Sequence, residues 1–208
     1  MKRAVLLSCL LAGCAAAPAP APVAPVSAPP SRTVAVPAQL APEGPFALKN
    51  PSFEMDEREG ATCATSWFCT MHKDPRSFRF FADDTQASDG KRSFCIEPTG
   101  RESFALVTQG ILGRTLNGAR VRFTLSVRLD NVGGQGAGTW ARVNRVRGGN
   151  PVTQNLAKDT RGWQDQSIEF EVPADAVNVE VGATLRGSGR ACFDNARLEV
   201  LRAAKKPV

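Results

Sequence analysis

The sequence has no tyrosine and only one histidine, His72, among its 208 residues. Tyrosine is a common contact residue of binding surfaces, and a lone histidine leaves a single candidate for a histidine-dependent triad, here without a nucleophile-elbow motif. Asp83 and Asp84 are adjacent, so on a strand they face opposite ways and do not form a glycosidase pair. The run Gly133–Gly138 lacks the lysine and following helix of a phosphate-binding loop, and we interpret it as a hairpin connection. We therefore expect no catalytic residues.

The chain also lacks an apolar run long enough to span a bilayer as a helix. It opens with Met1-Lys2-Arg3 and a short apolar stretch, which is typical of a secretory signal peptide. This stretch ends in Leu11-Ala12-Gly13-Cys14, which resembles the lipobox of bacterial lipoproteins. The resemblance implies that residues 1–13 are removed and that Cys14 carries a diacylglycerol thioether and an acylated (palmitate-type) amino group. The alternative is an ordinary signal peptide cut near residues 16–17.

The residue after the lipobox cysteine is Ala15 rather than Asp. In the resembled lipoproteins this favours release to the outer membrane, so we expect the chain in the bacterial envelope, facing the periplasm or the cell surface. An exported chain with a formal net charge of only +6 is not expected to bind nucleic acid.

Residues 15–43 contain eight prolines and almost no charge. Proline fixes φ and lacks an amide donor, so neither helix nor ladder is expected. A polyproline II spacer at about 3.1 Å per residue has a reach on the order of 90 Å. We predict a disordered Ala/Pro-rich linker at 14–44, a folded domain at 45–202 and a tail at 203–208. The linker would lift the domain off the membrane; recognition by a proline-binding partner is the alternative.

Within 45–202, period-two alternation dominates and helical periodicity is hard to find. Val121–Leu129 alternates apolar residues with Arg, Thr and Ser, and Val177–Leu185 repeats the pattern with Val177 predicted to point inward. Turn residues, including Asn131–Gly138, separate such segments. The sequence therefore predicts an all-β, two-sheet antiparallel sandwich. Further strands are expected at Phe94–Ile96, Phe104–Val107, Thr139–Arg145, Ser167–Val172 and Ala191–Leu198.

Several short motifs resemble carbohydrate-binding-module-like jelly rolls, also called galactose-binding-like domains. They are Asn50-Pro51-Ser52-Phe53-Glu54, Gly90-Lys91-Arg92-Ser93-Phe94, Thr108-Gln109, Gly162-Trp163-Gln164, Val172–Ala176 and Leu185–Gly189 followed by Phe193-Asp194-Asn195. Their order and spacing cover nearly all of residues 46–200. The resemblance implies a jelly roll in which the non-core side of one sheet forms a shallow ligand groove. Fold alone does not name a ligand.

Four cysteines remain once Cys9 and Cys14 are set aside, and an even number in an exported domain predicts disulfides. Three pairings are open. Cys63 and Cys69 close a short loop, and the strands that hold Cys95 and Cys192 are neighbours in the resembled fold, which implies a cross-strand bond there. A zinc site is the alternative.

The resembled fold often holds a structural calcium ion where the first strand meets the last. Glu54 and Asp194 match the positions that supply carboxylates, and backbone carbonyls near Asp89 and Lys91 would complete the oxygen shell. The alternative is that both carboxylates are solvated or paired with arginine.

The groove face predicted from alternation and from the resemblance collects one aromatic and several polar side chains. These are Gln109, Arg122, Arg128, Trp140, Arg142, Asn144, Glu180 and Arg186. Tryptophan stacks on sugar rings and arginine binds carboxylate or phosphate, so we expect a non-catalytic envelope protein that binds glycan or an anionic envelope polymer. Two alternatives stay open: Trp140 covers the core edge beside solvated arginines, or the sandwich is a structural adaptor that docks on another envelope protein.

Overall fold

The computed structural model describes residues 41–55 and 62–203. The predicted signal peptide, the lipidated Cys14, most of the predicted linker and residues 204–208 lie outside these residues. Within the described part, no helix has the length and apolar character needed to cross a membrane.

The described chain is all-β, as predicted. Its strands are β1 (Gly44–Phe46), β2 (Phe68–Met71), β3 (Phe78–Asp83), β4 (Ser93–Pro98), β5 (Ala105–Leu112), β6 (Arg120–Arg145), β7 (Val152–Glu171), β8 (Ala176–Arg186) and β9 (Arg190–Arg202). One short 3₁₀ turn, Gly113–Thr115, follows β5. All pairings are antiparallel, along the path β2-β5-β8-β6-β9-β4-β3.

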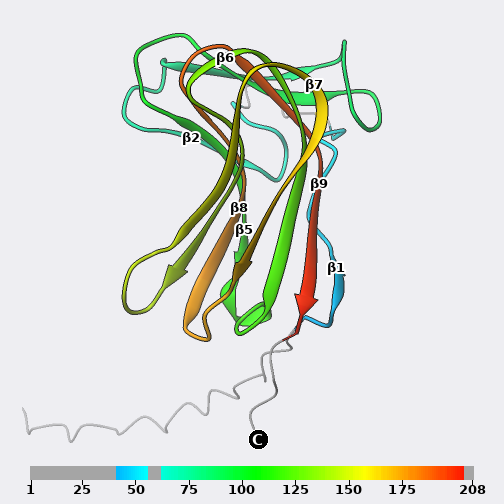
Figure 1. Cartoon of the computed structure of the whole chain (residues 1–208), viewed down its shortest axis with the longest axis vertical. Helices are drawn as coiled ribbons and strands as arrows, with labels where there is room; N and C mark the ends of the chain where they lie inside the picture. The colour runs from blue at the N-terminus through cyan, green and yellow to red at the C-terminus, as the bar shows by residue number, and fades with distance from the viewer. Residues whose placement is uncertain (1–40, 56–61, 204–208) are drawn as a thin grey trace, which may run out of the picture. The chain divides into compact units, whose positions relative to one another are not determined.

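The long strand β6 belongs to both layers of the sandwich. Its first arm, Arg120–Asp130, pairs with β9, and its second arm, Gly136–Arg145, pairs with β8. Strand β7 follows β6 through the same change of layer. In Figure 1 both strands rise in one layer, bend over the top and descend in the other. We call β2, β5, β8 and the second arm of β6 the groove layer, and β3, β4, β9 and the first arm of β6 the opposite layer.

The glycine-rich segment forms this bend, so its interpretation as a hairpin connection is wrong. The two arms that it joins pair with β9 and β8 and not with each other. The β6–β7 register shifts three times between Val127 and Ala137. Gly136 has φ 106°, and a Cβ there would lie 2.6 Å from the carbonyl oxygen of Ala157. Glycine is therefore required for both its backbone conformation and its lack of a side chain.

The core follows the predicted alternation. Val121, Phe123 and Leu125 are completely buried, as are Val179, Val181 and Leu185 on the facing layer. The prediction fails at Val177, which is 55% exposed. The β6–β8 register shifts between Asn144 and Arg145, which leaves Val177 without a partner on β6, and the buried neighbour is Ala176 instead.

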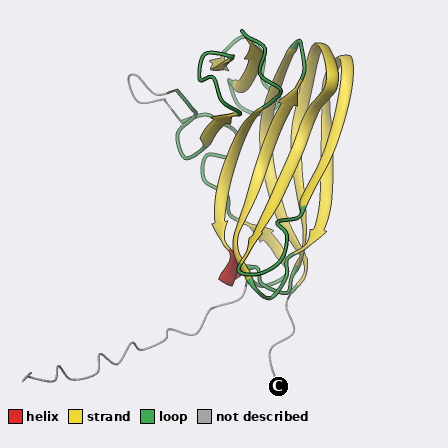
Figure 2. Ribbon diagram, turned by 90° about the vertical axis from the view of Figure 1, so that its left-hand side faces the viewer, coloured by secondary structure: helices red, strands yellow, loops and turns green. Residues whose placement is uncertain are grey.

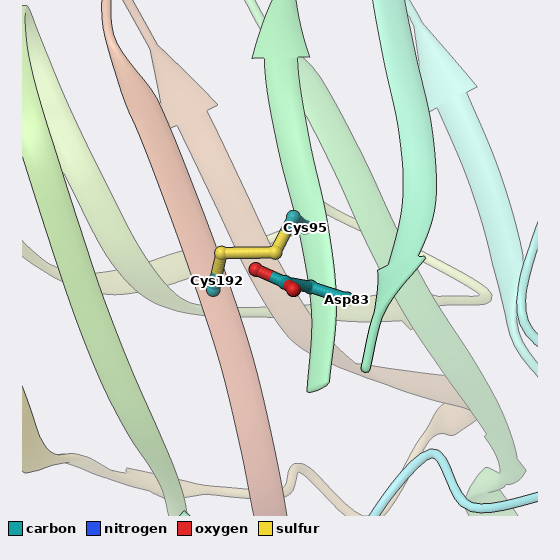
Figure 3. Close-up of side chains that lie close together, drawn as sticks. All are labelled: Asp83, Cys95 and Cys192. Atoms are coloured by element: carbon teal, nitrogen blue, oxygen red, sulfur yellow. A yellow bond between two sulfur atoms is a disulfide. The ribbon is translucent and has the colours of Figure 1, made fainter. Parts of the chain in front are cut away.

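The structure contains both expected disulfides, Cys63–Cys69 and Cys95–Cys192. Cys95 and Cys192 occupy directly opposite positions of β4 and β9 and are almost fully buried. Figure 3 shows the Asp83 side chain beside this bond. These three residues form the only group of three candidate metal ligands found within the described residues. Disulfide-bonded sulfurs are not thiolate ligands, so the zinc alternative does not apply here.

The folded part begins a few residues earlier than predicted. The Ala41 amide donates to the carbonyl oxygen of Thr115 at 2.8 Å, and the Ala41 side chain packs against the core. Gly44 then pairs with Val200. The last residues assigned to the linker therefore contact the domain. At the other end β9 ends at Arg202, and the Ala203 amide donates to Glu43.

Candidate functional site

The outer face of the groove layer is hollowed by a cavity of about 350 Å³. Alternate residues of four strands point to this face because side chains of a strand alternate between its two sides. Its lining residues are Thr70, Met71, His72, Phe104, Leu106, Thr108, Trp140, Arg142, Val152, Glu180 and Arg186. Figure 2 views the sandwich turned by 90° from Figure 1 and shows the strands packed side by side. We call this cavity the groove.

A hydrogen-bonded cluster around Glu180 forms one wall of the groove. Arg142 Nη2 donates to both Glu180 carboxylate oxygens, at 2.9 and 3.1 Å, and Asn144 Nδ2 donates to Glu180 Oε1 at 2.8 Å. The residues are brought together by the β6–β8 register, in which Arg142 stands opposite Glu180. The Glu180 side chain is only 20% exposed, and that of Arg142 is 41% exposed. This wall presents fixed donors and acceptors to the space beside it.

Two aromatic rings form the apolar part of the groove. Trp140 is 4% exposed, and the Arg142 guanidinium lies 5.7 Å from its ring centroid. Phe104, which is more accessible, has the Arg186 guanidinium 5.1 Å from its centroid. Trp140 therefore forms the floor of the groove. This nearly buried position agrees better with the alternative stated above, in which Trp140 covers the edge of the core, than with a ring exposed for stacking. Phe104 provides the more accessible ring.

His72 and Phe104 are groove residues that the sequence analysis did not assign. Their rings lie 5.6 Å apart, and His72 Nδ1 is 2.9 Å from Glu102 Oε2. The sequence indicates His72 only as a catalytic candidate and Phe104 only as a strand residue. Both lie at ends of strands, where alternation does not determine the direction of a side chain.

The face predicted as continuous is divided between the two layers. Trp140, Arg142, Asn144, Glu180 and Arg186 belong to the groove layer, whereas Arg122 and Arg128 lie on the first arm of β6 in the opposite layer. The bend in β6 causes this separation. The expectation that Arg122 and Arg128 share a face with the groove is therefore wrong.

Gln109 is also placed away from the groove. It is 8% exposed, and its side-chain amide accepts from the Lys49 amide and donates to the carbonyl oxygens of Lys49 and Ser66. These hydrogen bonds hold the loop before β2 in place. This placement contradicts its expected position on the ligand face.

Acids from other strands neutralise much of the arginine-rich sequence. Arg122 contacts Glu169 at 2.6 Å and Glu199 at 3.3 Å, and Arg120 and Arg202 form ion pairs with Glu169 and Glu171. The hydrogen bond from Arg122 is the main cause that lowers the pKa of Glu169 below its usual value. The outer face of the opposite layer is therefore a ladder of ion pairs and not an uncompensated cationic stripe.

The residues expected to hold calcium converge on one loop. Glu54 Oε1 accepts from the amides of Lys91 and Arg92, and Asp194 Oδ2 accepts from the amides of Ser88 and Asp89. Burial raises the pKa of the Asp194 carboxyl above its ordinary value, three backbone amides oppose this shift, and the Asp89 carboxylate adds to it. A buried carboxylate beside a second carboxylate is a donor set that suits a hard cation. The loop turns backbone amides, and not the expected carbonyl oxygens, toward Glu54 and Asp194. Within the described residues these carboxylates form no group of three candidate metal ligands, so calcium stays a prediction.

Comparisons with solved structures confirm the fold. The family 22 carbohydrate-binding module of Clostridium thermocellum Xyn10B is 14% identical, with a TM-score of 0.52 over 75% of this chain and 94% of that one. The CBM22-1 xylan-binding domain of Paenibacillus barcinonensis Xyn10C is 14% identical, with a TM-score of 0.54 over 74% and 93%. A sugar-binding protein from Bacteroides thetaiotaomicron, described as putative, is 12% identical, with a TM-score of 0.55 over 74% and 98%.

Sequence comparisons add nothing to this likeness. No protein-family model and no curated protein matches the chain. The similarity to the solved structures therefore shows a carbohydrate-binding-module-like jelly roll and leaves the ligand open.

Proposed function

We propose that this chain is a non-catalytic, glycan-binding lipoprotein of the bacterial envelope, attached to the outer membrane through lipid on Cys14. The groove carries the first part of this proposal. It combines the Phe104 ring, a tryptophan floor and the fixed Arg142–Glu180–Asn144 cluster on one face. An apolar ring beside fixed donors and acceptors suits a sugar, which has apolar ring faces and hydroxyl edges. One structural neighbour is described as xylan-binding.

The charge of the groove favours an uncharged glycan over a polyanion. Glu180 compensates Arg142. Arg186 covers Phe104 and donates from Nε to the neutral Gln135 side chain at 2.8 Å, so within the described residues its charge has no carboxylate partner and is the one cationic group that the groove offers. Arg142 already donates from Nη2 to the Glu180 carboxylate, so it offers an anionic ligand fewer free N–H donors and no net charge. We therefore expect neutral polysaccharide to bind more tightly than an anionic envelope polymer.

Affinity electrophoresis against soluble neutral and anionic polysaccharides, followed by calorimetry on those that retard the protein, tests this proposal. Arg142→Ala removes a charge-assisted donor from the groove and is expected to weaken binding at least about ten-fold. Arg122→Ala is the matched control, because Arg122 is also paired with a glutamate but lies in the opposite layer. Equal loss in both variants, or retardation by none of the polysaccharides, would contradict a ligand site at the groove.

The anchor is supported by Leu11-Ala12-Gly13-Cys14 and by the apolar stretch before it. Two acyl chains would give stable attachment, since each buried methylene contributes about 0.8 kcal/mol. In cells supplied with labelled palmitate, the wild-type chain should incorporate label and fractionate with membranes, whereas Cys14→Ser should do neither. Cys9→Ser is the matched control and should behave like the wild type. Membrane retention of an unlabelled Cys14→Ser protein would refute the anchor.

A structural adaptor role is the second candidate, and Phe68 supports it. This ring is 69% exposed and borders an apolar hollow of about 410 Å³ beside β2 and β5. Exposed apolar surface of this kind marks contact sites for other proteins. Phe68→Ser should leave glycan binding unchanged; if envelope integrity nevertheless fails in this variant alone, the adaptor role is favoured over the groove.

A further inference from the structure

The chain enters the domain at an end of the sandwich at which several other segments meet. The Ala41 amide donates to Thr115 in the 3₁₀ turn, and the Val146 amide donates to the Asp175 carbonyl oxygen. This end also holds several strand ends: the ends of β5, of the second arm of β6 and of β9, and the starts of β7 and β8. The arrowhead of β9 marks it at the bottom of Figure 1. Any anchor at Cys14 therefore joins the domain through this end.

Exposed apolar side chains gather at this end. Among the described residues, Leu112 is 57%, Val146 70% and Val177 55% exposed. They are neighbours in space, because Leu112 pairs with Asn178 and Arg145 pairs with Ala176. Single exposed apolar residues are ordinary, but several side by side indicate a contact surface.

Two exposed arginines accompany these apolar side chains. Arg114 lies in the 3₁₀ turn and Arg147 follows β6. Two acids of this end pair with other arginines, Asp175 with Arg145 at 2.9 Å and Glu171 with Arg202 at 2.6 Å. A third, Glu43, accepts a hydrogen bond from the Ala203 amide. Neither Arg114 nor Arg147 forms an ion pair within the described part of the chain. The end thus presents uncompensated positive charge beside apolar side chains.

We propose that this end, defined by Leu112, Arg114, Val146, Arg147 and Val177, rests on the anionic phospholipid surface to which the chain is anchored. The proposal depends on the lipid anchor proposed above. Basic side chains bind acidic headgroups, and neighbouring apolar side chains enter the boundary between headgroups and acyl chains. The contact is weak by itself, but anchoring converts it into an intramolecular event at high effective concentration. The contact keeps the domain at the bilayer, whereas the linker alone would allow the domain to move away from the membrane.

The contact leaves the glycan groove free. The groove lies on the outer face of the groove layer. Its Val152, at the start of β7, is nearest the proposed contact, whereas His72 and Arg186 lie at the far ends of β2 and β8. A domain that stands on its end would therefore present the groove sideways, open to polymer close to the membrane.

Vesicle flotation with residues 14–208 carrying Cys14→Ser, and therefore without the apolar stretch before Cys14, tests the contact without the lipid. Vesicles of phosphatidylethanolamine and phosphatidylglycerol are compared with pure phosphatidylcholine vesicles at low and high salt. We expect binding to the anionic vesicles only, weakened by salt. Arg147→Ala should reduce it about five-fold, and the double variant Val146→Asp/Val177→Asp should abolish it. Met55→Asp is the matched control, since Met55 is 51% exposed but lies beside Asn50 and away from this end.

Equal binding to both vesicle types, no binding at all, or equal loss in the Met55→Asp control would overturn the proposal. Circular dichroism of each variant separates lost contact from lost fold. Palmitate labelling of the wild-type chain is a separate readout: incorporation without vesicle binding by Cys14→Ser would leave the anchor intact and reject only the second contact.

Discussion

The two disulfides close loops of very different length, and this difference predicts how much each stabilises the domain. Cys95–Cys192 joins residues 97 apart in sequence, whereas Cys63–Cys69 joins residues 6 apart. In the chain-entropy description, the long loop is worth about 4.7 kcal/mol and the short one about 2.2 kcal/mol of the free energy of unfolding. Both bonds lie within one domain, so each serves as the control for the other.

Thermal unfolding of two double variants measures these contributions. At roughly 2–4 °C per kcal/mol for a domain of this size, Cys95→Ala/Cys192→Ala should lower Tm by about 10–20 °C, and Cys63→Ala/Cys69→Ala by about 4–9 °C. Truncation at the buried positions 95 and 192 leaves a small cavity and enlarges the first loss further. A short-loop variant that loses as much Tm as the long-loop variant would refute the argument from loop length.

Three further predictions concern the bend, the metal site and pH. Gly136→Ala should lower Tm by several degrees in calorimetry, because its positive φ and the nearby Ala157 carbonyl exclude a Cβ; an unchanged Tm would refute the steric argument. If Glu54 and Asp194 hold calcium, EGTA should lower the Tm of the wild type and leave that of Asp194→Asn unchanged, whereas equal melting with and without EGTA would exclude the ion. The pKa values of Glu97 and Glu169 are lowered mainly by hydrogen bonds from arginine, so their stabilisation is present above the unfolded value of about 4.3 and is lost as pH falls through the folded pKa. Melting curves should therefore show Tm decreasing below about pH 4; a Tm that rose there would contradict the sign.

The fold was predictable because burial in this chain follows a period of two. In Val121–Leu129 every second residue is almost completely buried, so alternation alone defined the core face. The disulfide pairing followed from the same rule together with the resembled fold, since Cys95 and Cys192 each stand between core residues and point to the same outer side. Alternation failed at Val177, where a register shift between β6 and β8 interrupts the period of two.

The bend in β6 was not predictable from alternation. Asn131–Gly138 has the composition of a turn, and such a segment ends one strand and begins another whether the arms pair with each other or separate into two layers. The second outcome divided the predicted ligand face between the two layers. The role of Gln109 as a loop support was not predictable either, because its hydrogen-bond partners Lys49 and Ser66 are distant in sequence and not identifiable from composition.

Charge was the least predictable property, for a reason that bears on the ligand. Between residues 114 and 147 the sequence has seven arginines and one acid, which indicates a cationic surface when it is considered along the chain. Across strands the balance changes: Glu169 lies 47 residues from Arg122, Glu199 lies 77 residues away, and Glu180 lies 38 residues from Arg142. In an antiparallel sandwich the nearest charges belong to other strands, so local sequence counts overestimate the field that a ligand meets. Within the described residues Arg114 and Arg147 form no ion pair: both lie beyond the strand ends, and Asp175, which is close to Arg147, pairs with Arg145 instead. The same topology that pairs Arg142 with Glu180 in the groove thus leaves Arg114 and Arg147 without an acid partner, among the described residues, at the end that leads to the proposed anchor.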